Sequence, residues 1–292
     1  MTPDEYCQEK AAKSGSSFYY AFLFLPDARR KAITALYAFC REVDDVVDEC
    51  TDEGIARTKL AWWHTQVSQM FEGNPTHPVT RALETHLTPF SMTEARLQAI
   101  ITGMEMDLDK SRYANWQELE NYCWHAAGVV GELSAGIFGY QMPETLTYAT
   151  KLGLAFQLTN IIRDVGDDAR RGRIYLPADE LEQFKVNTND ILQAHQTPEF
   201  EALMRFQTKR ARDLYAEAAS HLPETDRRTQ RPGLMMAAIY ATLLNEIEDE
   251  KWQVLDRRIS LTPIRKFWLA WRNWVAGGRP AIAQLTRAAS TK

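Results

Sequence analysis

Two groups of polar residues in this chain have the spacing of side chains that share one face of a helix. Asp44 and Asp48 stand four positions apart, and so do successive members of the set Asn160, Asp164 and Asp168. Residues three or four apart lie on the same side of an α-helix. Because the two groups are far apart in the sequence, only the fold can bring them together. Carboxylate and amide oxygens in this pattern are candidate ligands for a hard divalent cation.

Apolar residues frame both groups and indicate that the acidic faces point into the molecule. These residues are Val43, Val46 and Val47 in the first stretch, and Leu158, Ile161, Ile162 and Val165 in the second. Carboxylates that face one another inside a helical bundle repel and lose solvation, which is costly unless positive charge lies between them. Mg²⁺ binds a few carboxylates and takes waters and phosphate oxygens as its other ligands. The pattern therefore predicts a metal cluster that binds a diphosphate substrate, with two solvated acidic faces as the alternative.

Arginines accompany both groups. Arg41 lies one helical turn before the first group, and Arg163, Arg171 and Arg173 lie within or just after the second. Guanidinium groups match phosphate oxygens in bidentate geometry and stay charged. These arginines are therefore candidates to bind a diphosphate and to stabilise it as it leaves. For Arg163, an ion pair with a neighbouring helix is an equal alternative.

The segment 13–20 is rich in hydroxyl groups. Ser14 and Ser17 could present hydroxyls and backbone N–H groups to phosphate, and a plain turn before a helix is the alternative. The segment is not a P-loop, and no glycine-rich fingerprint follows a strand, so nucleotide binding has no support.

Three further sets of residues each have two readings. Tyr37, Tyr122, Tyr175 and Tyr240 could line an apolar cavity whose aromatic faces stabilise a carbocation, or they could be ordinary core. Small residues between Gly128 and Gly139 indicate close helix packing or room for a long apolar ligand. A third acidic cluster lacks an apolar frame on both sides, so we expect it to be solvated surface first and a neighbour of the metals second. Its members are Glu105, Asp107 and Asp109.

Composition is that of a soluble globular protein with a large core. Of 292 residues, 45% are hydrophobic and 25% are charged, and no linker divides the chain, so we expect one domain over 1–292. No segment is long and apolar enough to span a bilayer. The four cysteines lack C-x-x-C spacing and suit the reducing cytoplasm.

The C-terminal segment has a different charge from the rest of the chain. Residues 251–292 contain nine Lys or Arg and one acid, whereas the net charge of the whole chain is −5. Within the basic, Trp-rich segment at about 260–292, an apolar stripe has helical spacing; it consists of Ile264, Phe267, Trp268, Trp271, Trp274 and Val275. The stripe predicts either an interfacial helix in peripheral contact with a membrane surface or a last helix docked on the bundle. Nucleic acid is disfavoured, because no binding module accompanies the charge.

Helical periodicity dominates the chain, and strand signals are nearly absent. We therefore expect an all-α, multi-helix bundle. After a first helix that starts at residue 3, the predicted helices span 26–48, 55–71, 76–87, 93–110, 116–138, 144–168, 200–221 and 233–255.

The motifs together resemble one family. From Ser14 to about Arg258 the chain resembles the head-to-head trans-isoprenyl diphosphate synthases of the squalene/phytoene synthase type. The matching features are the opening that ends in Leu25-Pro26, the run 35–41 that leads into Asp44 and Asp48, Gly128-x-x-Gly131-Glu132, the stretch 157–168, and Arg173-Ile174-Tyr175-Leu176-Pro177. The resemblance implies an isoprenoid-synthase helical fold with a central cavity, three Mg²⁺ ions, and two prenyl diphosphates as substrates.

The resemblance also implies roles for individual residues. Those that would ligate or orient the metals are Asp44, Asp48, Asn160, Asp164 and Asp168. Those that would bind the diphosphates are Ser14, Ser17, Tyr37, Arg41, Arg163, Arg173, Tyr175 and Arg257. Those that would border the reacting carbons are Tyr122, Gln157 and Tyr240, with Asp44 and Asp48 as catalytic metal ligands.

Within the family the chain looks most like bacterial presqualene diphosphate synthases of hopanoid biosynthesis. That likeness implies condensation of two farnesyl diphosphates to presqualene diphosphate, without NADPH, in the cytoplasm or peripherally on the inner face of the membrane. The alternatives are a phytoene or dehydrosqualene synthase of the carotenoid branch and a full squalene synthase that uses NADPH. A head-to-tail synthase fits Asp44-Asp45-Val46-Val47-Asp48 but not the second motif. A non-enzymatic relative would not need all four aspartates.

Overall fold

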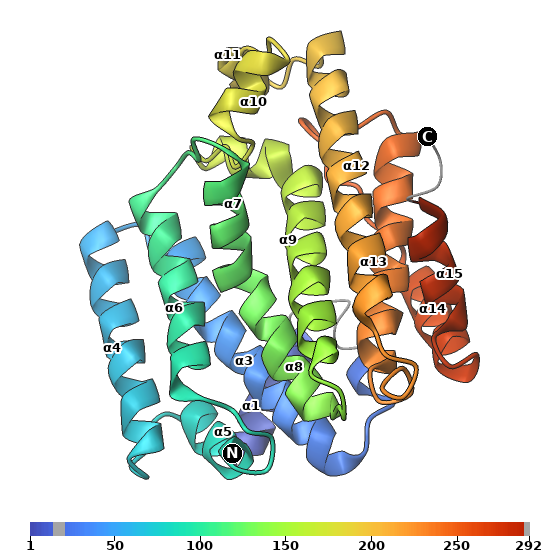
Figure 1. Cartoon of the computed structure of the whole chain (residues 1–292). Helices are drawn as coiled ribbons and strands as arrows, with labels where there is room; N and C mark the ends of the chain where they lie inside the picture. The colour runs from blue at the N-terminus through green and yellow to red at the C-terminus, as the bar shows by residue number, and fades with distance from the viewer. Residues whose placement is uncertain (14–20, 289–292) are drawn as a thin grey trace.

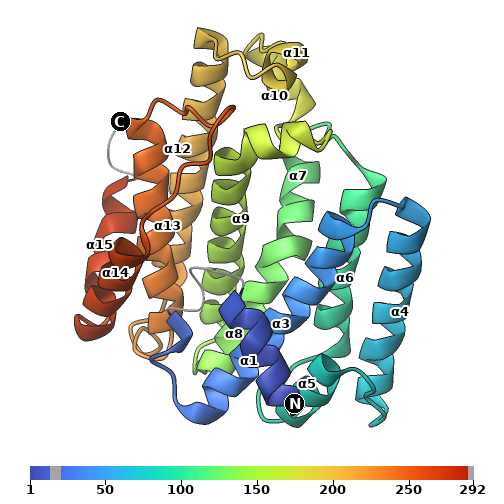
Figure 2. The same ribbon diagram turned by 180° about the vertical axis from the view of Figure 1, so that it is seen from behind.

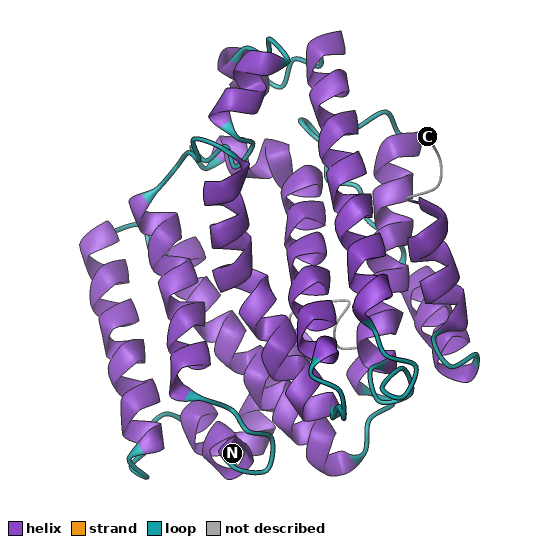
Figure 3. Ribbon diagram, viewed as in Figure 1, coloured by secondary structure: helices purple, strands orange, loops and turns teal. Residues whose placement is uncertain are grey.

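Helices make up the regular structure of the described part of the chain. The structure is a computed structural model that describes residues 1–13 and 21–288, and within these residues it holds no strand (Figures 1 and 3). The all-α class predicted from periodicity is thus confirmed. The helices are α1 (Pro3–Lys13), α3 (Asp27–Glu49), α4 (Glu53–Phe71), α5 (Pro78–Leu87), α6 (Glu94–Asp109), α7 (Trp116–Cys123), η1 (Trp124–Gly128), α8 (Val129–Phe138), α9 (Glu144–Arg170), α10 (Ala178–Gln183), α11 (Thr188–Leu192), α12 (Pro198–His221), α13 (Arg231–Asp249), α14 (Pro263–Val275) and α15 (Arg279–Ala288).

The long helix α9 lies in the middle of the bundle. It packs against α8, α12 and α13, while α4 lies at one outer edge and α14 and α15 lie at the other (Figures 1 and 2). Its buried positions, such as Leu158, Ile161, Ile162 and Val165, are those that framed the second acidic group in the sequence. The apolar frame therefore buries α9 and fixes the direction in which its polar residues point.

Both acidic groups lie near the C-terminal ends of their helices. Asp44 and Asp48 occupy the last turns of α3, which ends at Glu49, and Asp164 and Asp168 occupy the last turns of α9, which ends at Arg170. The C-terminal end of a helix carries partial negative charge. Carboxylates at this end are repelled by that partial charge, so a cation beside either group would be stabilised by both the carboxylates and the helix end.

The helix predicted over 116–138 is divided into three parts. Five residues of π-helix, Trp124–Gly128, separate α7 from α8. A π-turn inserts an extra residue and changes the direction in which the flanking side chains point. Tyr122, before it, lines a polar cavity, whereas Val130 and Gly131, after it, line an apolar one.

The helix predicted over 233–255 ends earlier, at Asp249. The chain then reverses at Lys251 and Trp252, both with positive φ, and Trp252 is buried with its Nε1 donating to the Thr208 hydroxyl at 2.8 Å. The returning segment lies directly on α9, because a Cβ on Gly166 would stand 2.1 Å from the carbonyl oxygen of Leu255. Only glycine allows this approach. The reversal carries residues 256–258 to the end of α9 that bears the acidic group.

In the part of the chain that the structure describes, no helix is both long and apolar enough to cross a lipid bilayer.

Candidate active site

A polar cavity of about 510 Å³ lies where α3, α6 and α9 meet. The structure brings together all five residues of the two groups, although Asp48 and Asp164 are more than a hundred positions apart in the sequence. Side chains from α7 and from the segment that follows α9 complete the wall. The polar residues of the lining are Arg41, Asp44, Asp48, Asp107, Tyr122, Gln157, Asn160, Arg163, Asp164, Asp167, Asp168, Arg171, Arg173, Tyr175 and Arg258.

Arginines form hydrogen-bonded ion pairs with the aspartates of this cavity. Arg41 donates to Asp44 at 2.6 Å, and Arg171 donates to Asp48 at 2.9 Å across the gap between α3 and the end of α9. Arg163 and Asp164, which are adjacent in sequence, form a bidentate pair. For Arg163, the alternative of an ion pair with a neighbouring helix is not what the structure shows. The same cations that partner the carboxylates are placed to bind phosphate oxygens.

The carboxylates differ in their affinity for protons. Burial raises the pKa of Asp44 to about 6 and that of Asp168 to about 7, and in both cases nearby aspartates add to the effect. Burial also works to raise the pKa of Asp164. Hydrogen bonds and charge from Arg163 and Arg258 outweigh burial there, so the pKa of Asp164 lies below its ordinary value. The charged forms of Asp44 and Asp168 are therefore disfavoured unless a further cation lies beside them, whereas that of Asp164 is already stabilised by its two arginines.

Asp107 belongs to the cavity, which corrects the expectation that it is solvated surface first. Its carboxylate accepts a hydrogen bond from the Tyr122 hydroxyl at 2.9 Å and from the Tyr175 hydroxyl at 2.7 Å. Burial raises the pKa of Asp107 to about 6. The sequence pattern missed this residue because the two tyrosines that shelter it come from α7 and from the loop after α9. Asp109 of the same cluster is exposed and pairs with Arg57 at 2.7 Å.

The donor set fits a hard divalent cation such as Mg²⁺. The Oδ1 atom of Asn160 is buried and has no hydrogen-bond partner among the described residues, so it is available as a ligand. Nowhere in residues 1–13 and 21–288 do three acidic, histidine or cysteine side chains converge closely enough to hold one ion by themselves. Mg²⁺ commonly takes one or two carboxylates and completes its shell with waters and substrate phosphates. The arrangement suits ions that arrive with a diphosphate.

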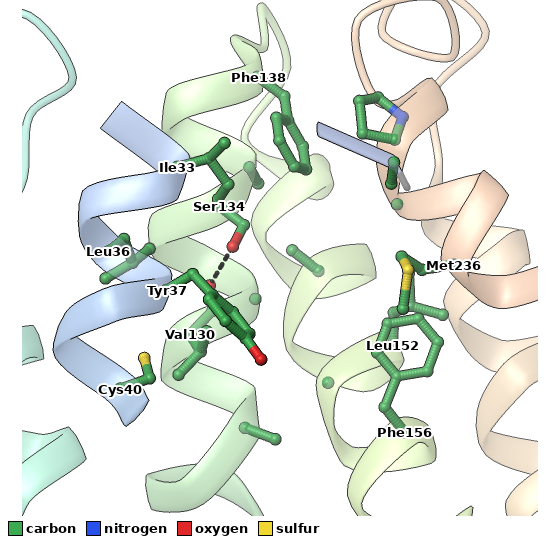
Figure 4. A pocket seen from close by; sticks show the side chains of 18 of the residues that line it. Ile33, Leu36, Tyr37, Cys40, Val130, Ser134, Phe138, Leu152, Phe156 and Met236 are labelled. Atoms are coloured by element: carbon green, nitrogen blue, oxygen red, sulfur yellow. Dashed lines mark hydrogen bonds between the residues drawn. The ribbon is translucent and has the colours of Figure 1, made fainter. Parts of the chain in front are cut away.

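An apolar cavity of about 200 Å³ adjoins the polar one (Figure 4). Cys40, Ala126, Gln157 and Asn160 line both cavities, so the two cavities are direct neighbours. Figure 4 shows its apolar walls on facing helices. The labelled residues are Ile33, Leu36, Tyr37 and Cys40 of α3, Val130, Ser134 and Phe138 of α8, Leu152 and Phe156 of α9, and Met236 of α13.

The small residues of α8 serve both purposes considered from the sequence. A Cβ on Gly131 would stand 2.3 Å from the carbonyl oxygen of Ala149, so α8 and α9 pack too closely for any other residue there. Gly131 and Ala135 also line the apolar cavity. The close contact between α8 and α9 therefore lies at the wall of the apolar cavity itself.

Three of the four tyrosines line a cavity, whereas Tyr240 is in the lining of neither. Tyr122 and Tyr175 face the polar cavity, where their rings stack at 5.2 Å between centroids. Tyr37 lines the apolar cavity, one turn before Arg41. Tyr240 is buried beside Phe156, with 4.7 Å between ring centroids. Aromatic rings thus line both cavities, and Phe156 of the apolar cavity is backed by Tyr240.

Three of the predicted substrate-binding residues are not placed in the cavity. Ser14 and Ser17 lie outside the described residues. Arg257 is exposed, pairs with Glu250 and Gln253, and is not part of the lining. Its neighbour Arg258 lines the cavity instead and donates to Asp164 at 2.8 Å.

Lys266 is a further cation on this side of the molecule that the sequence analysis did not assign to the site. Burial lowers its pKa, and the positive charges of Arg163 and Arg258 lower it further. Its ammonium group is therefore close enough to Arg163 and Arg258 to be repelled by their charges. Its position in the basic segment is the signal that could have found it.

The chain is similar to proteins of one enzyme family. The sequence profile of the squalene/phytoene synthase family matches residues 11–265. Phytoene synthase of Arthrospira platensis is 35% identical over 267 residues, which cover 87% of this chain and 86% of that protein. The chloroplastic phytoene synthase of Narcissus pseudonarcissus is 34% identical over 89% of this chain, but the match spans only 63% of that longer protein.

Solved structures give the same picture. A dehydrosqualene synthase crystallised with a ligand superposes with a TM-score of 0.83 at 30% identity, covering 94% of this chain and 96% of that one. The squalene synthase HpnC from Alicyclobacillus acidocaldarius superposes with a TM-score of 0.76 at 27% identity, covering 86% and 94%.

Proposed function

The chain belongs to the squalene/phytoene synthase family, and we propose that it condenses two molecules of farnesyl diphosphate head to head and releases presqualene diphosphate. The observation that carries the proposal is the pair of neighbouring cavities, one polar and one apolar, that share four lining residues. A polar cavity lined by aspartates and arginines meets an apolar cavity at Gln157 and Asn160, which line both. A prenyl diphosphate likewise has a polar half and an apolar half.

Binding of the diphosphates falls to the cations of the polar cavity. Arg41, Arg173 and Arg258 line it and present N–H donors that match phosphate oxygens. We assign the metal ligands to Asp44, Asp48, Asn160, Asp164 and Asp168. Three Mg²⁺ ions, when bound, would neutralise the diphosphates and stabilise the one that leaves.

The reaction breaks the C1–O bond of one farnesyl diphosphate, and the electron pair leaves with the diphosphate. The C2–C3 double bond of the second molecule attacks the allylic cation, and loss of one proton closes the cyclopropane. Tyr37 and Phe156, which line the apolar cavity, would offer aromatic faces to the cation, and Tyr240 packs against Phe156.

The base is better assigned to the departing diphosphate than to a tyrosine. Burial and the neighbouring Asp107 raise the pKa values of Tyr122 and Tyr175 well above the ordinary value, so both remain neutral. Both hydroxyls already donate to Asp107.

The far end of the apolar cavity supports a C15 substrate. Tyr148 lines it near the start of α9, at the opposite end of that helix from Asp164. The side chain is 1% exposed, and its hydroxyl has no hydrogen-bond partner in the described part of the chain. A large ring at this position shortens the space open to a prenyl chain.

A phytoene synthase, with C20 substrates, is the second candidate. The phytoene synthases of Arthrospira platensis and Narcissus pseudonarcissus, at 35% and 34% identity, are the observation that favours it. A dehydrosqualene synthase, and a full squalene synthase that reduces the product with NADPH, share the first steps.

We place the product in squalene and hopanoid biosynthesis, expect no requirement for NADPH, and locate the enzyme in the cytoplasm, peripherally on the inner face of the membrane. The supporting observation for this location is the exposed apolar stripe of α14.

Product analysis tests the proposal. The purified protein is incubated with Mg²⁺ and farnesyl diphosphate, with and without NADPH, and extracts are examined by mass spectrometry before and after phosphatase treatment. Presqualene diphosphate that accumulates regardless of NADPH is the expected result. Squalene formed only with NADPH, dehydrosqualene from farnesyl diphosphate, or phytoene formed only from geranylgeranyl diphosphate would each overturn it in favour of the corresponding alternative.

A further inference from the structure

Helix α14 exposes large apolar side chains along one face. Ile264 is 84% exposed and Val275 is 65% exposed, while Phe267, Trp268 and Trp271 are each close to half exposed. These five residues, which we call the α14 face, sit at helical spacing on α14, and α14 itself lies at the outer edge of the bundle beside α13 (Figure 2). A monomeric protein rarely leaves such a patch in water, so the face indicates a binding surface.

The rest of α14 is fixed firmly to the bundle. Leu269, Ala270 and Asn273 are buried, and Asn273 links the helix to α15 by accepting from the Ala281 amide at 2.8 Å. Trp274 packs against Phe24 and lies under the guanidinium of Arg231, 4.0 Å from the ring centroid. With its inner side already packed in this way, α14 has no need of its exposed stripe for docking. The alternative of a helix that simply docks on the bundle therefore leaves the α14 face unexplained.

Positive charge accompanies the α14 face. Among its 13 residues, α14 contains Arg265, Lys266 and Arg272 and no acid. Arg272 lies over the Trp268 ring at 5.0 Å, and Arg265 pairs with Glu246 at 2.7 Å. An amphipathic helix with aromatic residues on one side and basic residues around them is typical of segments that lie in a membrane interface. The basic side chains complement the negative charge of anionic lipid headgroups.

The length of α14 decides how it can meet a bilayer. Thirteen residues of helix extend about 20 Å, less than the roughly 30 Å of the hydrocarbon core, so α14 can lie along the surface but cannot cross it. Lying flat, the α14 face would reach the acyl boundary while Arg265 and Arg272 remain among the headgroups.

We propose that the α14 face is a membrane-binding surface that docks the enzyme on anionic lipid headgroups with Phe267, Trp268 and Trp271 inserted into the interface. This proposal specifies which surface would give the peripheral location included in the proposed function. It depends on the proposed function in one respect only, namely that the product is apolar. Phe24, which contacts Phe267 and Trp274, is two residues from Phe22 in the wall of the apolar cavity. Docking would therefore hold this side of the cavity wall close to the lipid.

Co-sedimentation with vesicles tests the surface without any substrate. Full-length protein is mixed with vesicles of phosphatidylglycerol and phosphatidylcholine or of phosphatidylcholine alone. We expect binding to the anionic vesicles that weakens as salt is raised. Trp268→Ser combined with Trp271→Ser should reduce the partition coefficient about tenfold or more. The matched control is Trp62→Ser, because Trp62 is equally exposed but lies on α4, at the opposite edge of the bundle.

Every outcome of this experiment bears on the proposal. Arg272→Gln should weaken binding to anionic vesicles more than binding to neutral ones. Equal binding of the wild type and the double variant, or no binding of the wild type, overturns the proposal. Sedimentation velocity without lipid tests whether a second copy of the chain covers the α14 face. A dimer of the wild type together with a monomer of the double variant would assign the face to that second copy and overturn the proposal. Unchanged helicity and turnover of soluble substrate in the double variant show that the fold is intact, and failure of the proposed function would appear only in turnover.

Discussion

The guanidinium of Arg258 donates to the carboxylate of Asp164 at 2.8 Å, although 94 positions separate the two residues in the sequence. The contact depends on the chain reversal at Lys251 and Trp252 and on the close approach that Gly166 allows. Arg257, one residue earlier, points to Glu250 on the surface. The structure therefore places Arg258 in the polar cavity and Arg257 on the surface, although the two are adjacent in the sequence.

Replacing each of these arginines in turn tests the distinction. Arg258→Gln should lower kcat/KM about 10²-fold, the order expected for loss of one charged donor aimed at a leaving diphosphate. Arg257→Gln is the matched control and should change kcat/KM by less than about threefold, since its ion pair is exposed. Steady-state kinetics with farnesyl diphosphate measures both. The opposite ranking would place Arg257, not Arg258, at the diphosphate.

The metal assignment predicts large effects for two aspartates. Asp48→Asn and Asp164→Asn should each lower turnover by orders of magnitude, because an amide replaces a charged ligand, while circular dichroism shows an intact fold. Asp213→Asn, which removes only an exposed pair with Lys209, serves as the control. Turnover and Mg²⁺ titrations are the readouts. Near-normal activity in either site variant would contradict the metal assignment.

The donor chain length should depend on Tyr148. Tyr148→Ala removes the ring at the far end of the apolar cavity and should shift the ratio of kcat/KM values for C15 and C20 substrates toward C20. Tyr148→Phe keeps the ring and removes only a hydroxyl that lacks a partner among the described residues, so it should keep the wild-type preference. Because the ratio compares two substrates on the same variant, a loss of folded protein lowers both kcat/KM values equally and leaves the ratio unchanged. An unchanged ratio in Tyr148→Ala would show that other residues set the length.

The sequence was sufficient for the parts of the site that one helix determines. The apolar frames around Asp44 and Asp164 predicted both the helices and the inward direction of the carboxylates, because a helix buries one face. Asp107 was undervalued because its shelter comes from Tyr122 and Tyr175 on other elements. Arg258 was missed because its position depends on a reversal after α13. Such placements depend on tertiary packing, which local periodicity does not encode.

The stripe of α14 illustrates a related limit. The spacing of Phe267, Trp268 and Trp271 predicts a helix with an apolar side but does not say what covers that side. A docked helix and an interfacial helix have the same pattern. Only the packed positions of Leu269, Ala270 and Asn273 on the opposite side show which residues face the bundle.

In the metal-free protein, Asp168 and Asp44 should contribute less and less to stability as pH rises from about 5 to about 8. Burial raises the pKa of Asp168 to about 7 and that of Asp44 to about 6, above the values near 4 of unfolded chains. A raised folded-state pKa means that the native state binds more protons in this window. The contribution is fully present below the unfolded pKa and is lost as pH passes the folded pKa. Asp44 should contribute the smaller part, because its side chain is 39% exposed to solvent.

Thermal unfolding in EDTA measures this loss. Burial lowers the pKa of His77 and His86, which therefore add stability as pH rises in the same window. Asp168→Asn isolates the carboxyl, because the variant keeps both histidines. The melting temperature of the wild type should fall relative to that of Asp168→Asn as pH rises through about 7. Mg²⁺ with inorganic diphosphate should restore the wild type at the upper pH but not the variant, since cations then neutralise the paired carboxylates. A melting-temperature difference between the wild type and Asp168→Asn that stays constant with pH in this window would show that Asp168 is already ionised in the folded protein and stabilised by Arg171 and Arg173.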